Sequence, residues 1–360
     1  MLTGSVVALS AAPYLGLGQW LTARVAHLVR RRVLVGADLV RAAAFLAMAL
    51  PVGIPGRLAL LLVASIATPP FDATAGALVP RTVPAQLLGI ANGLRTAATE
   101  AAFVIGFALG GLLSDLVSPM PVLALNGCTF LVSAFILSRL GPAADAPSGA
   151  DVGSIRFADG FAAVRRDALA FRTVCLVALA FTFALVPETL VATYVDEALS
   201  PTDGLTGLLA SAVALTVVAT ALLLKRPDDD TALLRQAAAV ITVGGLVSTA
   251  AFASSAGVGG AAVAYLAIGP VLATRIHLFT VLGQRVEDRL LAPAMSVASG
   301  TLALSYVVAG FAGGAAAELF GVEDAFAVAC GLAAVVGIVG LALQLRASPA
   351  RRPVSSAVRG

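Results

Sequence analysis

Ionisable residues interrupt several long apolar stretches of the sequence. Glu100 lies about 13 residues into the stretch at residues 87–113, or roughly 20 Å along a helix that rises about 1.5 Å per residue. An ionised group in hydrocarbon costs about 2.5–3.5 kcal/mol, and burial favours the protonated form of a carboxyl. Glu100 is therefore a candidate for proton coupling or substrate binding, and the alternative is a structural partner for another helix.

Four further polar residues could line the same cavity. Arg95 lies about 140° from Glu100 around a helix at about 100° per residue, so we expect these two side chains not to pair. Asp72 and Glu188 each follow proline, which frees backbone carbonyls at a break beside water. The alternatives are a position near the cytoplasmic interface for Asp72 and snorkelling to the outer face for Glu188. Asn126 is either a cavity residue or the donor of an interhelical hydrogen bond.

A second group of charges lies near the start of the apolar stretch at residues 33–52. Asp38 and Arg41 are three residues apart, which is close enough for a charge pair on one face of a helix. Arg30 and Arg31 precede them in a basic run. We expect these four residues to lock the cytoplasmic end of the protein.

The composition indicates what kind of protein must position these residues. Of 360 residues, 59% are hydrophobic and 12% are charged, whereas a soluble domain has about 25% charged residues. The single lysine, Lys225, follows no glycine-rich loop, so no P-loop ATPase is encoded. The three cysteines are far apart, and the two histidines have no ligand at helical spacing, which argues against a disulfide framework and a metal site. The sequence predicts an all-α polytopic membrane protein without cofactor, metal or catalytic site.

About eleven apolar stretches of spanning length recur along the chain. They lie at about 5–22, 33–52, 57–78, 87–113, 121–139, 171–194, 204–224, 235–254, 258–282, 290–316 and 323–345. The loops between them alternate between basic and acidic, and basic loops stay in the cytoplasm. This alternation predicts a cytoplasmic carboxy terminus and an outer Met1.

The longest polar interval divides five spans from six. We expect a bundle at residues 1–140, a cytoplasmic linker at 141–170, a second bundle at 171–346 and a basic cytoplasmic tail at 347–360. Within the linker, apolar residues alternate with arginines and aspartates from Ile155 to Arg172. This pattern predicts an amphipathic helix on the inner membrane surface.

An internal repeat relates the two predicted bundles. The stretch at residues 104–116 and the stretch at 308–319 share Gly-Phe-Ala, a Gly-Gly pair and a following carboxylate, each in the penultimate span of its half. The glycines concerned are Gly106, Gly110, Gly111, Gly310, Gly313 and Gly314. Parallel repeats joined by a cytoplasmic linker are typical of one class of secondary transporters, and small residues also let helices pack closely.

With these motifs the sequence resembles the major facilitator superfamily, and within it the bacterial efflux branch of macrolide and siderophore exporters. The resemblance rests on Leu2-Thr-Gly-Ser, on the loop at residues 18–33, on Asp38-Leu-Val-Arg41 and on the glycine helix at 106–111. It implies a two-bundle fold of which the eleven spans are family helices two to twelve, so the first helix is missing. It also implies that the glycines permit bending during alternating access.

The sequence departs from the family pattern at four positions. Thr22, Ala26 and His27 replace the glycine, aspartate and arginine of the family's loop, and Phe107 stands where antiporters carry a proline. The aspartate helps to latch the two halves in the family, so that latch is in question here.

Three functions follow from these observations. The leading hypothesis is a monomeric transporter of a bacterial inner membrane that exports an amphipathic drug or metabolite by proton antiport. Its partners are then a small molecule, protons and the lipid bilayer, and no nucleic acid. The alternatives are a truncated, degenerate family member with a binding or accessory role, and a membrane enzyme, which the lack of a Gly-x-Ser-x-Gly motif disfavours.

Overall fold

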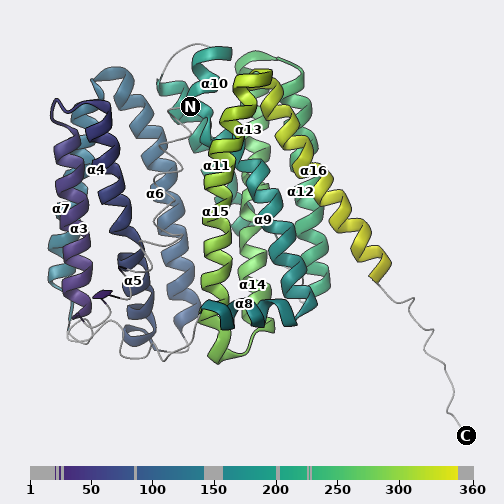
Figure 1. Ribbon diagram of the computed structural model, residues 1–360, viewed down its shortest axis with the longest axis horizontal. Helices are drawn as coiled ribbons and strands as arrows, with labels where there is room; N and C mark the ends of the chain where they lie inside the picture. The colour runs from purple at the N-terminus through teal and green to yellow at the C-terminus, as the bar shows by residue number, and fades with distance from the viewer. Residues whose placement is uncertain are drawn as a thin grey trace, which may run out of the picture.

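A computed structural model shows an all-helical chain arranged as two bundles side by side (Figure 1). It describes residues 21, 24, 25, 28–84, 87–141, 157–199, 203–224, 227 and 229–347. The helices of the first bundle are α3 (Arg30–Met48), α4 (Ile54–Ile66), α5 (Thr68–Thr82), α6 (Leu88–Leu116) and α7 (Pro119–Ser138). Alanine, leucine and valine dominate these segments, and the helical conformation pairs the backbone polar groups of each segment interior within the segment, as hydrocarbon requires.

Within the described ranges, the second bundle contains more helices than the first and most of the buried core. Its helices are α9 (Ala168–Thr189), α10 (Val191–Ala198), α11 (Asp203–Leu223), α12 (Asp230–Ala253), α13 (Gly257–Ala273), α14 (Arg275–Arg285), α15 (Asp288–Phe320) and α16 (Val322–Ala347). Helix α12 packs on α13 and α16, and α9 packs on α15 and α16. Gly321 ends α15 with φ of 89°, a left-handed conformation that favours glycine in the tight turn to α16.

The membrane character predicted from composition agrees with the helices. Among the described residues, eight segments are long and apolar enough to cross a bilayer, and the shorter apolar stretch Ala101–Leu113 lies in α6. Ten of the eleven predicted spans fall on described helices, and of the first, at residues 5–22, the structure describes Leu21 alone. Many large apolar side chains on both bundles are exposed, as expected of surfaces that face lipid.

Three predicted spans are interrupted. The sixth, at residues 171–194, is divided into α9 and α10 at Leu190. The third is divided into α4 and α5 at Ala67, because Pro69 and Pro70 have no amide hydrogen and fit the first turn of a new helix. The ninth is divided into α13 and α14 at Thr274. Each of these three predicted spans is therefore built from two consecutive helices.

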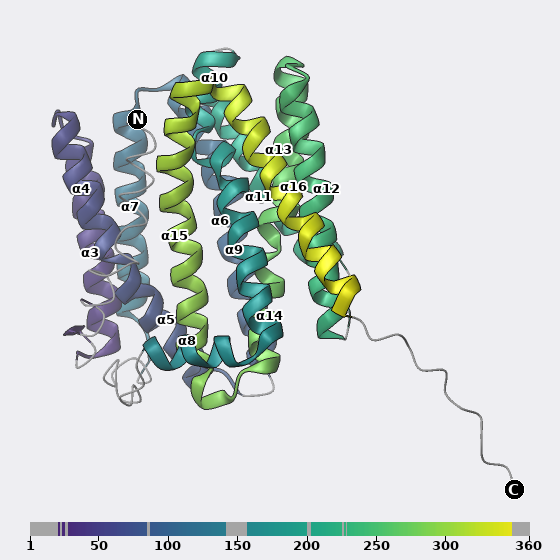
Figure 2. The same cartoon turned by 45° about the vertical axis from the view of Figure 1, so that its right-hand side comes forward.

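The amphipathic helix predicted from Ile155 to Arg172 is shorter than expected. Helix α8 (Phe157–Arg166) lies across the ends of α9, α14 and α15 (Figure 2), and Arg172 already belongs to α9. The division occurs at Asp167, whose carboxylate accepts hydrogen bonds from the amides of Leu169 and Ala170 at 2.9 and 2.8 Å. This N-cap starts α9 before the predicted helix would end.

The two ends of the molecule differ in charge. The end at which α3 begins and across which α8 lies is called the arginine-rich end below. Its arginines include Arg30, Arg31, Arg32, Arg139, Arg165, Arg166, Arg172, Arg235 and Arg285. The opposite end carries Arg57 and the carboxylates Asp196, Glu197, Glu318, Glu323 and Asp324. This separation is the one that the alternating loops predict.

Candidate functional site

A buried ion pair lies at the centre of the contacts between α3, α5 and α7. A nitrogen of the Arg41 guanidinium is 2.6 Å from Asp38 Oδ1, and the two side chains are 10% and 1% exposed. The guanidinium carbon also lies 4.2 Å from the ring centre of Phe71 and 4.9 Å from that of Phe130. A planar cation stacks well between aromatic rings. The predicted charge pair is therefore present, and it joins three helices.

The two arginines that precede this pair lie at the start of α3, and one of them contacts the end of α7. Arg31 donates a hydrogen bond of 2.5 Å to the carbonyl oxygen of Leu140, just beyond the end of α7. A cation at this position also interacts favourably with the negative end of the helix dipole. Arg30, the first residue of α3, is fully buried. These positions favour the structural role that the sequence suggested for both residues.

Helix α6 carries the strongest predicted coupling residue. Glu100 is 12 positions after Leu88, or about 18 Å along a helix whose 29 residues span about 43 Å. Its backbone therefore lies near the middle of the helix. The side chains of Glu100 and Arg95 are outside the part of the chain that the structure describes, so their proton-coupling and cavity roles stay predictions.

One face of α6 is open. A Cβ atom added to Gly106 or Gly110 would have no neighbouring atom within 4 Å. The rings of Phe103 and Phe107 stack with centres 6.1 Å apart, and both are at least 40% exposed. Phe103, Gly106 and Gly110 recur at helical spacing and lie on one face of α6. This face is therefore available to a ligand or to lipid.

A neighbouring face of α6 joins the two bundles by packing against α11. A carbon added to Gly207 of α11 would lie 2.7 Å from the Cα of Gly111 and also too close to the carbonyl oxygen of Phe107. Only hydrogen fits at this crossing, so the helix backbones are in direct contact. Gly207 was not among the predicted site residues, because nothing in the local sequence marks the helix that it meets.

The matching glycines of α15 make a different contact. A carbon added to Gly313 would lie 2.7 Å from a methyl group of Val186 and 3.4 Å from one of Leu190. Gly310 and Gly314 are buried, and the space beside Gly314 is open. In the α6 motif Gly111 therefore makes a contact between the two bundles, whereas in the α15 motif Gly313 makes a contact within the second bundle.

The remaining predicted cavity residues do not converge on one point. Glu188 is half-buried in the last turn of α9, about 30 Å from the start of that helix. Beside it, the Tyr265 hydroxyl donates a hydrogen bond of 2.8 Å to the carbonyl oxygen of Pro187. Asp72 is exposed on α5, and Asn126 is half-buried on α7, where the Thr129 hydroxyl donates to its backbone and side-chain oxygens. The cavity-lining roles of Glu188, Asp72 and Asn126 therefore stay predictions.

At the arginine-rich end, Arg285 connects the starts of two helices. Its Nε lies 2.8 Å from a carboxylate oxygen of Asp230 at the start of α12 and 4.0 Å from one of Asp167 before α9. Gly160 of α8 lies directly against Pro293 of α15, so the linker helix is fastened to the same region. This network, like the Tyr265 contact, joins residues distant in sequence and had no local signal.

Hydrogen bonds also fix the acidic turn before α12. The Thr231 hydroxyl and the Ala232 amide donate to Asp229 and hold the pKa of that exposed carboxyl below its usual range. Among the described residues, no group of three or more histidine, cysteine, aspartate or glutamate side chains is placed to hold a metal ion. His277 instead lies 2.9 Å from the amide oxygen of Gln236.

Comparison with known proteins matches this architecture to one family. Residues 1–284 match the family described as Major Facilitator Superfamily. No curated protein matches the sequence. Among solved structures, a variant of the nucleoside transporter NupG is similar with a TM-score of 0.74 and 12% identity, over 95% of this chain and 90% of that chain. A variant of the peptide transporter POT is similar with a TM-score of 0.70 and 13% identity, over 96% and 84%. At these identities the likeness shows the fold alone.

Proposed function

The chain belongs to the Major Facilitator Superfamily, and we propose that it is a secondary transporter that exports an amphipathic small molecule in exchange for protons. The observation that carries the proposal is the contact between α6 and α11 at Gly111 and Gly207. At this point the small residues let the backbones of the two bundles meet directly, and the bundles would tilt about this contact. Such tilting around a fixed site is the movement that alternating access requires.

The proposed orientation of the chain in the membrane is inferred from the charges at its two ends. Arginines in short loops are retained on the cytoplasmic side, so we place the arginine-rich end in the cytoplasm of a bacterial cell, with the carboxy terminus on the same side. The acidic outer end would then release the exported molecule. The combined charge of its carboxylates, rather than any single one of them, favours a cation, and the apolar content of the chain favours an amphipathic one.

Proton coupling is assigned to Glu100. Its backbone lies near the middle of α6, the helix that joins the bundles, where an ionised group in hydrocarbon is costly. A change of charge on this helix would then alter how α6 packs on α11. Asp72, Glu188, Arg95 and Asn126 are the further candidates for lining the substrate path.

Efflux in inside-out membrane vesicles tests the proposal. Ethidium, a cationic amphipathic dye, should accumulate in vesicles that contain the wild-type chain and an imposed proton gradient. Glu100→Gln should abolish this accumulation while the protein remains in the membrane. Glu318→Gln, an exposed carboxylate at the end of α15, is the matched control and should leave accumulation unchanged. Equal accumulation with Glu100→Gln would refute the coupling role.

A further inference from the structure

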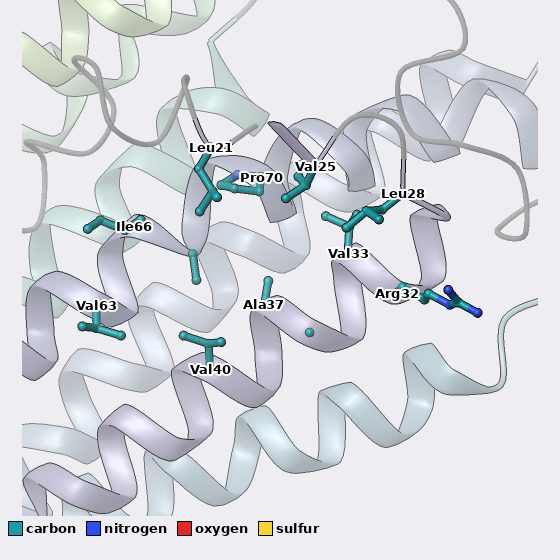
Figure 3. Close-up of a pocket in the computed structure, with 12 residues that line it drawn as sticks. Leu21, Val25, Leu28, Arg32, Val33, Ala37, Val40, Val63, Ile66 and Pro70 are labelled. Carbon is teal, nitrogen blue, oxygen red and sulfur yellow. The ribbon is translucent and has the colours of Figure 1, made fainter. Parts of the chain in front are cut away.

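An apolar groove opens on the outside of the first bundle, away from the contact with α11. It has a volume of about 410 Å³ and lies between α3, α4, the start of α5 and the described residues Leu21, Val25 and Leu28 (Figure 3). Its lining residues are apolar except for one arginine, and include Leu21, Leu28, Val33, Ala37, Val63 and Ile66. The volume falls within the range of about 300–1,000 Å³ that is usual for ligand pockets.

Small residues create the groove. Gly36 and Ala37 of α3 face Ala67 between α4 and α5, and a carbon added to Gly36 would meet no atom within 4 Å. Val40 and Val63, at one end of the groove, are 43% and 46% exposed. The groove therefore opens sideways onto a surface of exposed apolar side chains, which is the surface that contacts lipid.

A cation stands at the other end of the groove. Arg32 is exposed, and Figure 3 shows its guanidinium pointing away from the apolar residues. None of the described carboxylates lies within ion-pair distance of this side chain. Arg32 and Val40 are eight residues apart, so the groove extends about 12 Å along α3 from the arginine-rich end.

We propose that this groove binds an anionic phospholipid of the membrane leaflet at the arginine-rich end, with an acyl chain against Gly36 and Ala37 and the phosphate at Arg32. Half of a hydrocarbon core of about 30 Å is about 15 Å, so the groove follows most of the leaflet. Guanidinium binds phosphate through charge-assisted hydrogen bonds, and basic pockets between helices on the cytoplasmic side bind lipid head groups. An apolar peptide or helix would gain nothing from the exposed cation, which favours a lipid as the occupant.

Native mass spectrometry of the purified full chain tests this assignment. The protein is equilibrated with phosphatidylglycerol, and bound lipid is counted for the wild type, Arg32→Gln and Gly36→Phe. We expect Arg32→Gln to weaken binding at least about tenfold, because a hydrogen bond between charged groups contributes on that order. Gly36→Phe should fill the groove and prevent binding. Phosphatidylcholine should bind the wild type more weakly than phosphatidylglycerol does.

Matched controls separate the groove from general effects. Arg139→Gln removes an exposed arginine at the same end, and Gly259→Phe places a large side chain at another open glycine. Both should bind phosphatidylglycerol like the wild type. Thermal unfolding in detergent checks that each variant is folded. Unchanged binding by Arg32→Gln and Gly36→Phe, or equal losses in the two controls, would overturn the proposal. Displacement of the lipid by inorganic phosphate alone would also overturn it, because the groove would then contribute nothing.

Discussion

Removing one partner of the Asp38 and Arg41 pair should destabilise the first bundle strongly. The two side chains are 1% and 10% exposed and 2.6 Å apart, so neither Asp38 nor Arg41 can reach water without moving a helix. Breaking a buried pair costs about 3–5 kcal/mol, because the remaining charge is left uncompensated. At roughly 2–4 °C per kcal/mol for a domain of about 150–250 residues, Arg41→Met should lower the Tm by roughly 6–20 °C.

Two further variants separate the charge from the stacking. Arg41→Lys keeps the positive charge but loses the planar contacts with Phe71 and Phe130, 4.2 and 4.9 Å away, and should cost about 1–2 kcal/mol. The double variant Asp38→Leu with Arg41→Met removes both charges together. Apolar replacement of a buried pair is often neutral or stabilising, so this variant should unfold close to the wild-type temperature.

The assay is the loss of monodisperse protein on heating in detergent, followed by size-exclusion chromatography. Arg139→Met is the control, because Arg139 is exposed over the ring of Phe135 and its loss should cost less than about 1 kcal/mol. A destabilisation of about 1 kcal/mol shifts Tm by about 2 °C. The reasoning would therefore be refuted if the Tm of Arg41→Met lay within about 2 °C of the Tm of the control. A double variant as unstable as Arg41→Met would also refute it, because the two changes would then not be coupled.

Three other contacts lead to predictions. Gly207→Leu should overpack the contact with α6 at a cost of about 1–3 kcal/mol, and should therefore lower Tm and abolish ethidium accumulation in vesicles. Gly259→Leu, at a glycine with open space beside it, should change neither quantity. Normal accumulation with Gly207→Leu would contradict the role of the contact. Asp167→Ala should cost about 1 kcal/mol by removing the N-cap of α9, measured as Tm in detergent, and an unchanged Tm would show that the two amides are satisfied otherwise. Arg285→Gln should lower Tm only slightly at low salt and not at all at high salt, because its pair with Asp230 is partly exposed and screened; a loss that salt does not alter would contradict this.

Local patterns in the sequence predicted a large part of this fold. Apolar length located ten described spans, and the spacing of Asp38 and Arg41 predicted their ion pair, because both depend on residues that are neighbours along a helix. The paired prolines at residues 69 and 70 carried a signal for the break between α4 and α5, although a single span was expected there. Hydropathy averages over such a break and therefore does not detect it.

Contacts between distant segments could not be predicted in the same way. Phe71 and Phe130 enclose Arg41 from two other helices, Gly207 meets a helix about 100 residues earlier, and Arg285 joins two helix starts. Each of these residues has an ordinary local environment in the sequence. Their partners depend on how the helices are arranged, which periodicity and composition do not specify.

Substrate-coupled proton movement in proteoliposomes tests the central claim most directly. Purified protein is reconstituted with a pH-sensitive dye inside, a pH gradient is imposed, and ethidium is added. The account predicts a proton flux that begins with ethidium, runs opposite to the dye and disappears in Glu100→Gln but not in Glu318→Gln. Ethidium movement without proton flux, or the same flux in Glu100→Gln, would contradict it.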